Sequence, residues 1–133
     1  MSSGLRAALM AALLMPSLTL GGTAVAAPVP AQMVDRPAAR VQSLDKVTAR
    51  TSTFDIAVGE TKAFGNLRIT LRACKENPPI EPPEAAAFFE VVEVKPDSNA
   101  EPVFNGWMFA SSPALSAMEH PIYDLWVLSC QAK

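Results

Sequence analysis

The sequence is poor in the residues that most often build metal and catalytic centres. It contains one histidine and two cysteines among 133 residues. Zinc normally takes three or four histidine, cysteine or carboxylate ligands, so we predict no metal site, and no cofactor of any other kind. No short motif that fixes a reaction is present. The sequence therefore leaves the chemistry of the protein open.

Positive charge is scarce as well. Eleven lysine and arginine residues stand against thirteen aspartate and glutamate residues, which gives a formal net charge of −2. A protein that binds nucleic acid usually carries a basic patch that neutralises phosphates. No such patch is present, so nucleic acid is not an expected partner.

The first 26 residues have the pattern of a cleavable signal peptide. Arg6 precedes an uncharged apolar stretch over residues 7–20, and Ala24-Val25-Ala26 is an A-x-A cleavage site. A spanning helix needs about 20 apolar residues, and Pro16 interrupts this shorter stretch. No later segment is long and apolar enough to cross a bilayer. We therefore expect export, with no transmembrane span after cleavage.

Residues 27–46 are predicted to form a flexible tether. Pro28, Pro30 and Pro37 interrupt this range, and its apolar residues follow no sustained period. We expect the compact domain to cover residues 47–133.

The domain is predicted to be all-β, because its periodicity is that of strands. Leu67, Ile69 and Leu71 alternate with polar residues, as in a half-buried strand. Further strands are expected over residues 54–58, 88–94, 103–110 and 122–130. Both faces of the last of these are apolar, which favours a central position in its sheet. The pattern favours a small, mainly antiparallel sandwich or barrel.

Two local features interrupt the strand pattern. Ser112 and Pro113 suit the N-cap and first position of a short helical turn. Asn105-Gly106 is compatible with either a tight hairpin or a bulge.

Cys74 and Cys130 are expected to form one disulfide, because export places them in an oxidising compartment. Catalytic dithiols usually occur as C-x-x-C in a thioredoxin-like setting. The two cysteines lie far apart in the sequence, which favours a structural bridge over a redox-active pair.

The motifs G-W-M-F, S-S-P and H-P-x-Y-D-x-W follow one another between Phe104 and Cys130. Together with FGNLRITLRAC around Cys74, they resemble a family of small exported alphaproteobacterial proteins, the domain of unknown function 2155. The resemblance covers about residues 47–131. It implies a periplasmic location and brings no known reaction, cofactor or catalytic residue.

His120 is the candidate for catalysis. With Ser112 and Asp124 nearby in the sequence, it suggests a Ser-His-Asp arrangement. The alternative is structural: Ser112 caps the helical turn, and His120 and Asp124 fix the start of the last strand by hydrogen bonds.

The candidate binding surface combines a proline-rich loop with exposed polar and aromatic residues. Four prolines within residues 78–83 favour a pre-ordered polyproline conformation, which loses little entropy on binding. The same loop could also be a solvated connector. Four strand aromatics could form a stacking platform for sugar rings or peptide, or belong to the core: Trp107, Phe109, Tyr123 and Trp126. We expect this surface to lie where residues 78–83 meet residues 111–124. The expected contact residues are Ile80, Glu81, Trp107, Glu119, His120 and Tyr123.

Taken together, these patterns predict a binding or envelope-associated interaction module in the periplasm. Its partner would be a protein, a peptide or a glycan of the envelope. The alternatives are a small hydrolase that uses His120 and an accessory subunit of an envelope complex.

Overall fold

Strands make up nearly all the regular structure in the computed structural model, which describes residues 14, 15, 17, 21 and 32–133. The predicted signal peptide lies almost entirely outside the described residues. In the described part of the chain, the elements are β1 (Val34–Arg36), β2 (Ala38–Asp45), β3 (Arg50–Ala57), β4 (Thr61–Phe64), β5 (Leu67–Glu76), β6 (Ala85–Glu93), β7 (Glu101–Phe109), the 3-10 turn η1 (Pro113–Ser116) and β8 (Tyr123–Gln131). No helix in this part is long and apolar enough to cross a membrane.

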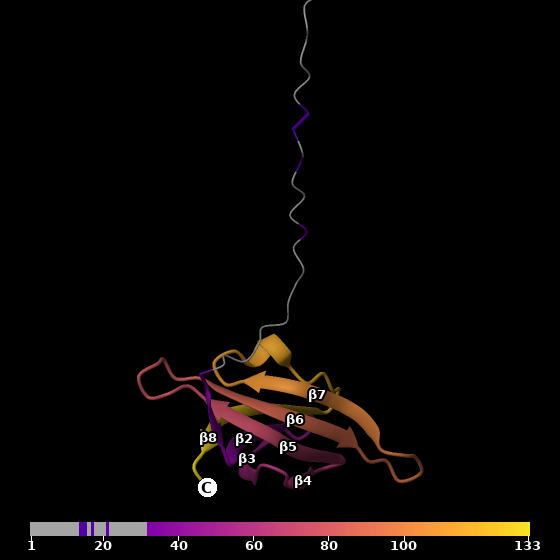
Figure 1. Ribbon diagram of the computed structural model, residues 1–133. Coiled ribbons are helices and arrows are strands. Elements are labelled where there is room, and N and C mark those ends of the chain that lie inside the picture. The colour runs from indigo at the N-terminus through magenta and orange to yellow at the C-terminus, as the bar shows by residue number, and fades with distance from the viewer. Residues whose placement is uncertain (1–13, 16, 18–20, 22–31) are drawn as a thin grey trace, which may run out of the picture.

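The strands form two antiparallel sheets that pack as a sandwich (Figure 1). One sheet has the order β1-β5-β6-β7, with β4 also paired to β5, and the other has the order β3-β2-β8. The prediction of an all-β, mainly antiparallel domain with one short helical turn is confirmed. Of the two architectures predicted, the sandwich is the one observed.

Alternating side chains from both sheets fill the core. Leu67, Ile69 and Leu71 of β5 are fully buried, as the sequence pattern predicts. The β5–β6 register shifts between Leu71 and Ala73, so that Cys74 also faces inward. The opposite sheet contributes Val41, Ile56, Leu125 and Val127 to the same cluster.

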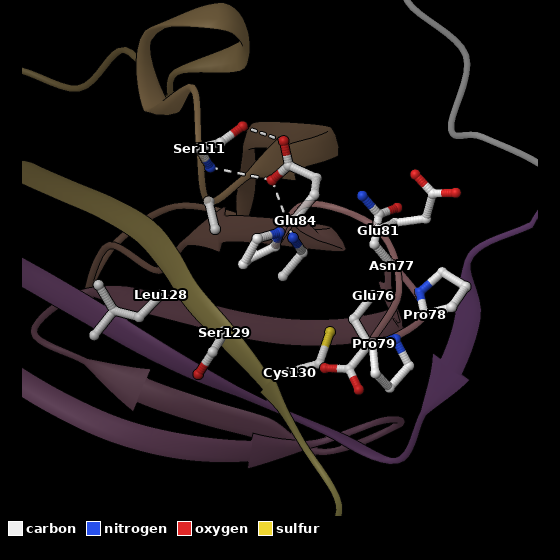
Figure 2. Close-up of a pocket in the computed structure, with 13 residues that line it drawn as sticks. Glu76, Asn77, Pro78, Pro79, Glu81, Glu84, Ser111, Leu128, Ser129 and Cys130 are labelled. Carbon is white, nitrogen blue, oxygen red and sulfur yellow. Dashed lines mark hydrogen bonds between the residues drawn. The ribbon is translucent and has the colours of Figure 1, made fainter.

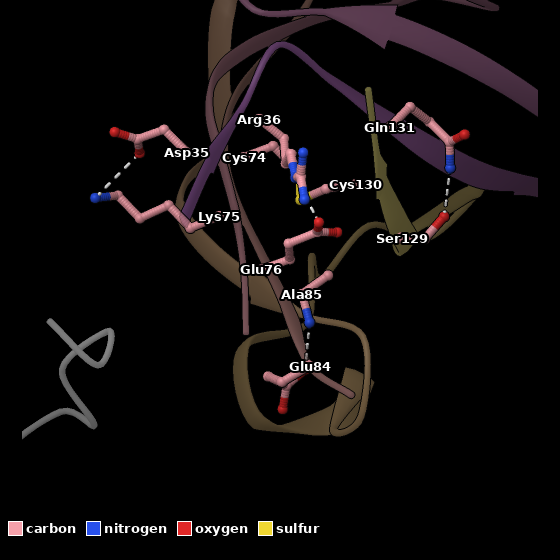
Figure 3. The surroundings of a disulfide bond; sticks show 10 residues. All are labelled: Asp35, Arg36, Cys74, Lys75, Glu76, Glu84, Ala85, Ser129, Cys130 and Gln131. Atoms are coloured by element: carbon pink, nitrogen blue, oxygen red, sulfur yellow. Dashed lines mark hydrogen bonds and ion pairs between the residues drawn. A yellow bond between two sulfur atoms is a disulfide. The ribbon is translucent and has the colours of Figure 1, made fainter. Parts of the chain in front are cut away.

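The predicted disulfide is present and joins the two sheets (Figure 3). Cys74 lies in β5 and Cys130 in β8, with their Cα atoms 5.9 Å apart. This spacing is ordinary for a disulfide. The bridge links β5 of one sheet covalently to β8 of the other.

The structure differs from the predicted tether over residues 27–46. β1 and β2 occupy most of the part of this range that is described, and β2 is the central strand of its sheet. Its buried side chains are Ala38, Ala39, Val41 and Ser43, which are small and give a weak hydrophobic signal. Pro37 lies between β1 and β2, where the chain passes from one sheet to the other. It therefore interrupts neither strand.

The last strand also differs from its prediction. Among the described residues, β8 pairs with β2 alone, so it is an edge strand and not a central one. Its inner face carries Tyr123, Leu125 and Val127. The outer apolar residues Trp126 and Leu128 line pockets, which explains why both faces look apolar in the sequence.

Two smaller expectations also need correction. Asn105 and Gly106 form neither a hairpin nor a bulge, because they pair regularly with Glu90 and Phe89, and the register shift of this ladder lies at Val103. Ser112 makes no side-chain capping bond to η1, although Pro113 does begin the turn.

Candidate functional site: two pockets along β8

The proline-rich connection between β5 and β6, residues 77–84, is held in a defined shape by its own hydrogen bonds. We call it the proline loop. Across its base, Asn77 N donates to Glu84 O at 3.0 Å, and Asn77 Nδ2 donates to Pro82 O at 2.8 Å. Its tip is closed by Glu81 N, which donates to Pro78 O at 3.0 Å. The loop is therefore ordered without being helical.

Glu84 fastens the proline loop to the end of β7 (Figure 2). Its carboxylate accepts hydrogen bonds from Ala85 N at 3.0 Å, from Ser111 N at 3.1 Å and from the Ser111 hydroxyl. One ionised group thus satisfies three donors from two segments, and such charge-assisted bonds are the stronger kind. The proline loop and Ser111 form one continuous surface.

A pocket of about 470 Å³ opens between the proline loop, Ser111 and the end of β8 (Figure 2). It is lined by Glu76, Asn77, Pro78, Pro79, Glu81, Pro83, Glu84, Ala85, Ala110, Ser111, Leu128, Ser129 and Cys130. The lining combines proline and alanine surfaces with carboxylates, and it includes one sulfur-bearing residue of the disulfide. We call it the proline-loop pocket.

The three carboxylates of this pocket differ in their partners. Glu76 accepts a hydrogen bond from Arg36 Nε and forms an ion pair with it (Figure 3). Glu84 is engaged by Ala85 and Ser111. For the Glu81 side chain, the described residues supply no hydrogen bond and no ion pair. Glu81 is therefore the carboxylate that is available to a ligand.

A β-bulge in β8 includes Leu128, which lines the proline-loop pocket. Ser129 pairs with Arg40 and Val127 pairs with Val41, which leaves Leu128 as the extra residue in β8. A bulge bends its strand and changes the direction of a side chain. Leu128 is 39% exposed and lines the pocket, although its strand neighbours Val127 and Cys130 point into the core.

A second pocket, of about 290 Å³, lies farther along β8. It is lined by Pro113, Ala114, Ala117, Asp124, Leu125 and Trp126. Both pockets thus have one wall in β8 and another in residues 110–117. We call the two pockets, together with the stretch of β8 between them, the β8 seam.

The predicted contact residues do not all meet at one place. Ile80 is 91% exposed at the tip of the proline loop, and Glu81 lines the proline-loop pocket. Glu119 is exposed and lines neither pocket. Trp107 packs edge-on against Phe88, with ring centroids 5.3 Å apart.

Tyr123 is a core residue and not a surface platform. It is buried and packs edge-on against Phe64, with ring centroids 5.5 Å apart. Trp126, by contrast, lines the second pocket. The aromatic platform predicted from Trp107, Phe109, Tyr123 and Trp126 is therefore not assembled.

The hydrogen bonds of His120 indicate a structural role at the start of β8. It is buried, and its Nδ1 accepts hydrogen bonds from Ile122 N at 3.1 Å and from Tyr123 N at 3.2 Å. Nε2 then carries the hydrogen and donates to Glu93 Oε2 at 3.0 Å. Both ring nitrogens are engaged, and Lys46 Nζ donates to the His120 carbonyl at 2.9 Å.

The other two members of the predicted Ser-His-Asp set do not join His120. Ser112 is exposed, and Asp124 accepts a hydrogen bond from Leu125 N at 2.9 Å. In the described part of the chain, no hydrogen bond links either residue to His120. The same residues contain no group of three or more histidine, cysteine, aspartate or glutamate side chains placed to hold a metal ion.

The single surface predicted between residues 78–83 and 111–124 is divided into two. Glu84 precedes β6 and Glu93 ends it, so the clamp at Ser111 and the His120 cluster lie about 30 Å apart at 3.3 Å per strand residue. Figure 1 shows the corresponding loops at opposite ends of the sandwich. Only Ser111, with the neighbouring residues of η1, stays close to the proline loop.

Outside the β8 seam, a surface ion pair shifts the pKa of an aspartate. Arg40 of β2 lies opposite Asp55 of β3 and donates to it at 2.9 and 3.2 Å. The hydrogen bond from Arg40 holds the pKa of the Asp55 carboxyl below its usual value. The pair contributes to the β2–β3 contact and not to the seam.

A model of a bacterial family matches the chain over residues 39–130, under the description "uncharacterized protein conserved in bacteria (DUF2155)". The chain belongs to the DUF2155 family. The resemblance inferred from the sequence motifs is therefore confirmed. The matched range of this DUF2155 protein begins inside β2 and contains every residue of the β8 seam.

One relative of the DUF2155 protein is "Uncharacterized protein RP359" from Rickettsia prowazekii (strain Madrid E). The two are 34% identical over 91 residues, which is 68% of this chain and 59% of the relative. The chain thus spans about 59% of the length of this curated relative. No solved structure matches the chain.

Proposed function

We propose that the protein is an exported binding module whose ligand site is the β8 seam. The observation that carries this proposal is the proline-loop pocket, a concave site of about 470 Å³ that mixes apolar walls with an unpaired carboxylate. Ligand sites are typically concave, mainly apolar and equipped with a few polar groups that fix orientation. The ligand class is a protein, peptide or glycan of the cell envelope.

The rigidity of the walls supports a binding role. The disulfide fixes Cys130, the Glu84 carboxylate fixes Ser111, and the Asn77 bonds fix the base of the proline loop. Prolines restrict the remaining backbone freedom. A pre-organised site loses less conformational entropy when a ligand binds.

The proposed location is the periplasm. The disulfide is consistent with an oxidising compartment, because such bonds are rare in the cytosol. The A-x-A pattern at Ala24-Val25-Ala26 supports cleavage before Ala27. Intact-mass measurement of the protein recovered from periplasm tests both points. A mass that retains residues 1–26, or two free thiols, would contradict them.

The binding role is tested by changing the pocket without changing the core. The double substitution Ile80→Ala with Glu81→Ala removes exposed side chains, and surface changes of this kind usually alter stability by less than about 0.5 kcal/mol. We expect a smaller yield of partner after chemical crosslinking in the periplasm. The control is Glu119→Ala, which removes an exposed carboxylate that lines neither pocket. Equal yields from both variants would contradict the proposal.

A further inference from the structure

The outer backbone edge of β8 has no strand beside it in the described part of the chain. β8 covers Tyr123–Gln131 and makes its ladder with β2 on one side only. Tyr123 N donates to His120 Nδ1 and Leu125 N donates to Asp124 Oδ1, whereas outside the ladder the described residues give no hydrogen bond to the backbone of residues 126–131. Such an edge is a template for an added strand, and folded proteins usually cover or blunt it.

The two pockets follow this edge at a spacing that suits an extended chain. β8 lines the second pocket with Asp124, Leu125 and Trp126, and it lines the proline-loop pocket with Leu128, Ser129 and Cys130. The middle residues of these sets, Leu125 and Ser129, pair with Ser43 and Arg40 of β2, so the bulge leaves them three ladder positions apart, about 10 Å along a strand. A short extended peptide can therefore reach both pockets.

The negative charge of the seam favours basic peptides. Its lining holds four carboxylates, those of Glu76, Glu81, Glu84 and Asp124, and no lysine or arginine. Arg36 balances only Glu76, from outside the lining. Lysine and arginine carry apolar stems below a charged end. Prolines and Leu128 would contact the stem in the first pocket, and the Trp126 ring offers a cation–π surface in the second.

We propose that the β8 seam binds an extended, basic peptide segment by strand addition to β8. The backbone of the peptide pairs with the unbonded part of the edge, and two lysine or arginine side chains enter the two pockets. This is a known mode of peptide recognition, in which main-chain bonds supply affinity and pockets supply specificity. The inference rests on the binding function proposed above and names its ligand class.

The first test selects ligands without assuming a sequence. A display library of random heptapeptides is panned against the oxidised protein, against Glu81→Lys with Asp124→Lys, and against Glu119→Lys as the control. We expect the wild type and the control to enrich the same peptides, each with at least two basic residues. We expect the double variant to bind these peptides at least about tenfold more weakly. No enrichment, or enrichment without basic residues, would overturn the proposal.

The second test asks whether the peptide adds as a strand. Hydrogen exchange of the amides in Tyr123–Gln131 is measured with an enriched peptide and with the same peptide methylated at alternate backbone nitrogens. Strand addition predicts slower exchange along β8 with the first peptide and no binding by the second. Equal binding by both peptides would overturn strand addition, because methylation leaves the charges in place.

A second copy of the chain is the competing occupant of the edge. Concentration-dependent dimers that protect β8 without peptide would contradict the peptide proposal. The binding function is tested separately from the ligand class. If the Ile80 and Glu81 substitutions reduce partner capture while no basic peptide binds, the ligand class is wrong and the site is right. If neither effect is seen, both are wrong.

Discussion

At the scale of single residues, Gly65 shows how a turn is fitted to the core. Its φ angle is +55°, in the left-handed region that favours glycine. A Cβ atom at this position would lie 2.3 Å from the Tyr123 hydroxyl oxygen. That hydroxyl accepts a hydrogen bond from Asn66 N at 3.4 Å. The turn between β4 and β5 is therefore shaped around a tyrosine from the opposite sheet.

Substitution of Gly65 should be unusually costly. We expect Gly65→Ala to lower the free energy of unfolding by about 2 kcal/mol or more, since it combines left-handed strain with a steric clash. Gly59→Ala is the matched control, because Gly59 has a φ of +88° but nothing lies within 4 Å of the added Cβ. Urea unfolding measures both variants. If they lose equal stability, the contact with Tyr123 is unimportant.

His120 is expected to matter for folding before it matters for binding. His120→Ala leaves the N–H groups of Ile122 and Tyr123 without their acceptor and leaves Glu93 without its donor. Unsatisfied buried polar groups of this kind predict a loss of about 2 to 4 kcal/mol. His120→Asn should recover part of the loss, because its side-chain oxygen can replace Nδ1 as acceptor.

One result would contradict this structural role of His120. An alanine variant with wild-type stability that has lost its cellular role would favour a catalytic histidine. Glu119→Ala serves as the neighbouring control, since Glu119 is exposed.

At the scale of elements, the sequence predicts best where the strand pattern is strong and local. The alternation in β5 is found where it was predicted. β2 escapes prediction because three of its four buried side chains, Ala38, Ala39 and Ser43, are not strongly apolar. Its place in the sandwich depends on pairing with β3 and β8. Such long-range pairing leaves little trace in local periodicity.

The site could be predicted only in part, for a similar reason. Four prolines and the exposed Ile80 mark the proline loop in the sequence, and the structure places Ser111 beside it. Alternation with Val127 already places Leu128 on the outer face, but the bulge that turns Cys130 inward is defined only by the register with β2. His120 seemed close to the loop because the sequence does not show that they lie at opposite ends of β6.

The importance of β2 leads to a prediction about truncated chains. A chain that begins at Val47 lacks β1 and β2, so β3 and β8 lose the strand that pairs with both. We expect this chain to show no cooperative unfolding transition. A chain that begins at Gln32 keeps both strands and should unfold cooperatively. Thermal melts followed by circular dichroism compare the two, and a cooperative transition in the shorter chain would contradict the role of β2.

At the scale of the whole molecule, the disulfide is the main covalent support. It links residues 56 positions apart and bridges the two sheets. The chain-entropy model assigns a loop of this length about 4 kcal/mol of stabilisation. Small domains have little stability in reserve.

Removal of both cysteines should therefore lower the thermal midpoint strongly. We expect Cys74→Ser with Cys130→Ser to lose about 2 to 5 kcal/mol of stability. The loss should match that of the wild type after reduction, since both lack the same bridge. Scanning calorimetry provides the comparison. An unchanged midpoint in the double variant would mean that the bridge contributes nothing to stability.

The central claim is that the β8 seam is where the protein meets its ligand. It is tested most directly by a photo-crosslinking amino acid placed at single positions in the protein inside living cells. Position 128 lies in the proline-loop pocket and is 39% exposed, whereas position 47, in the turn between β2 and β3, is more accessible at 77%. The account predicts a discrete crosslinked product from position 128 and none from position 47. Crosslinking at position 47 alone, or the same products from both positions, would contradict it.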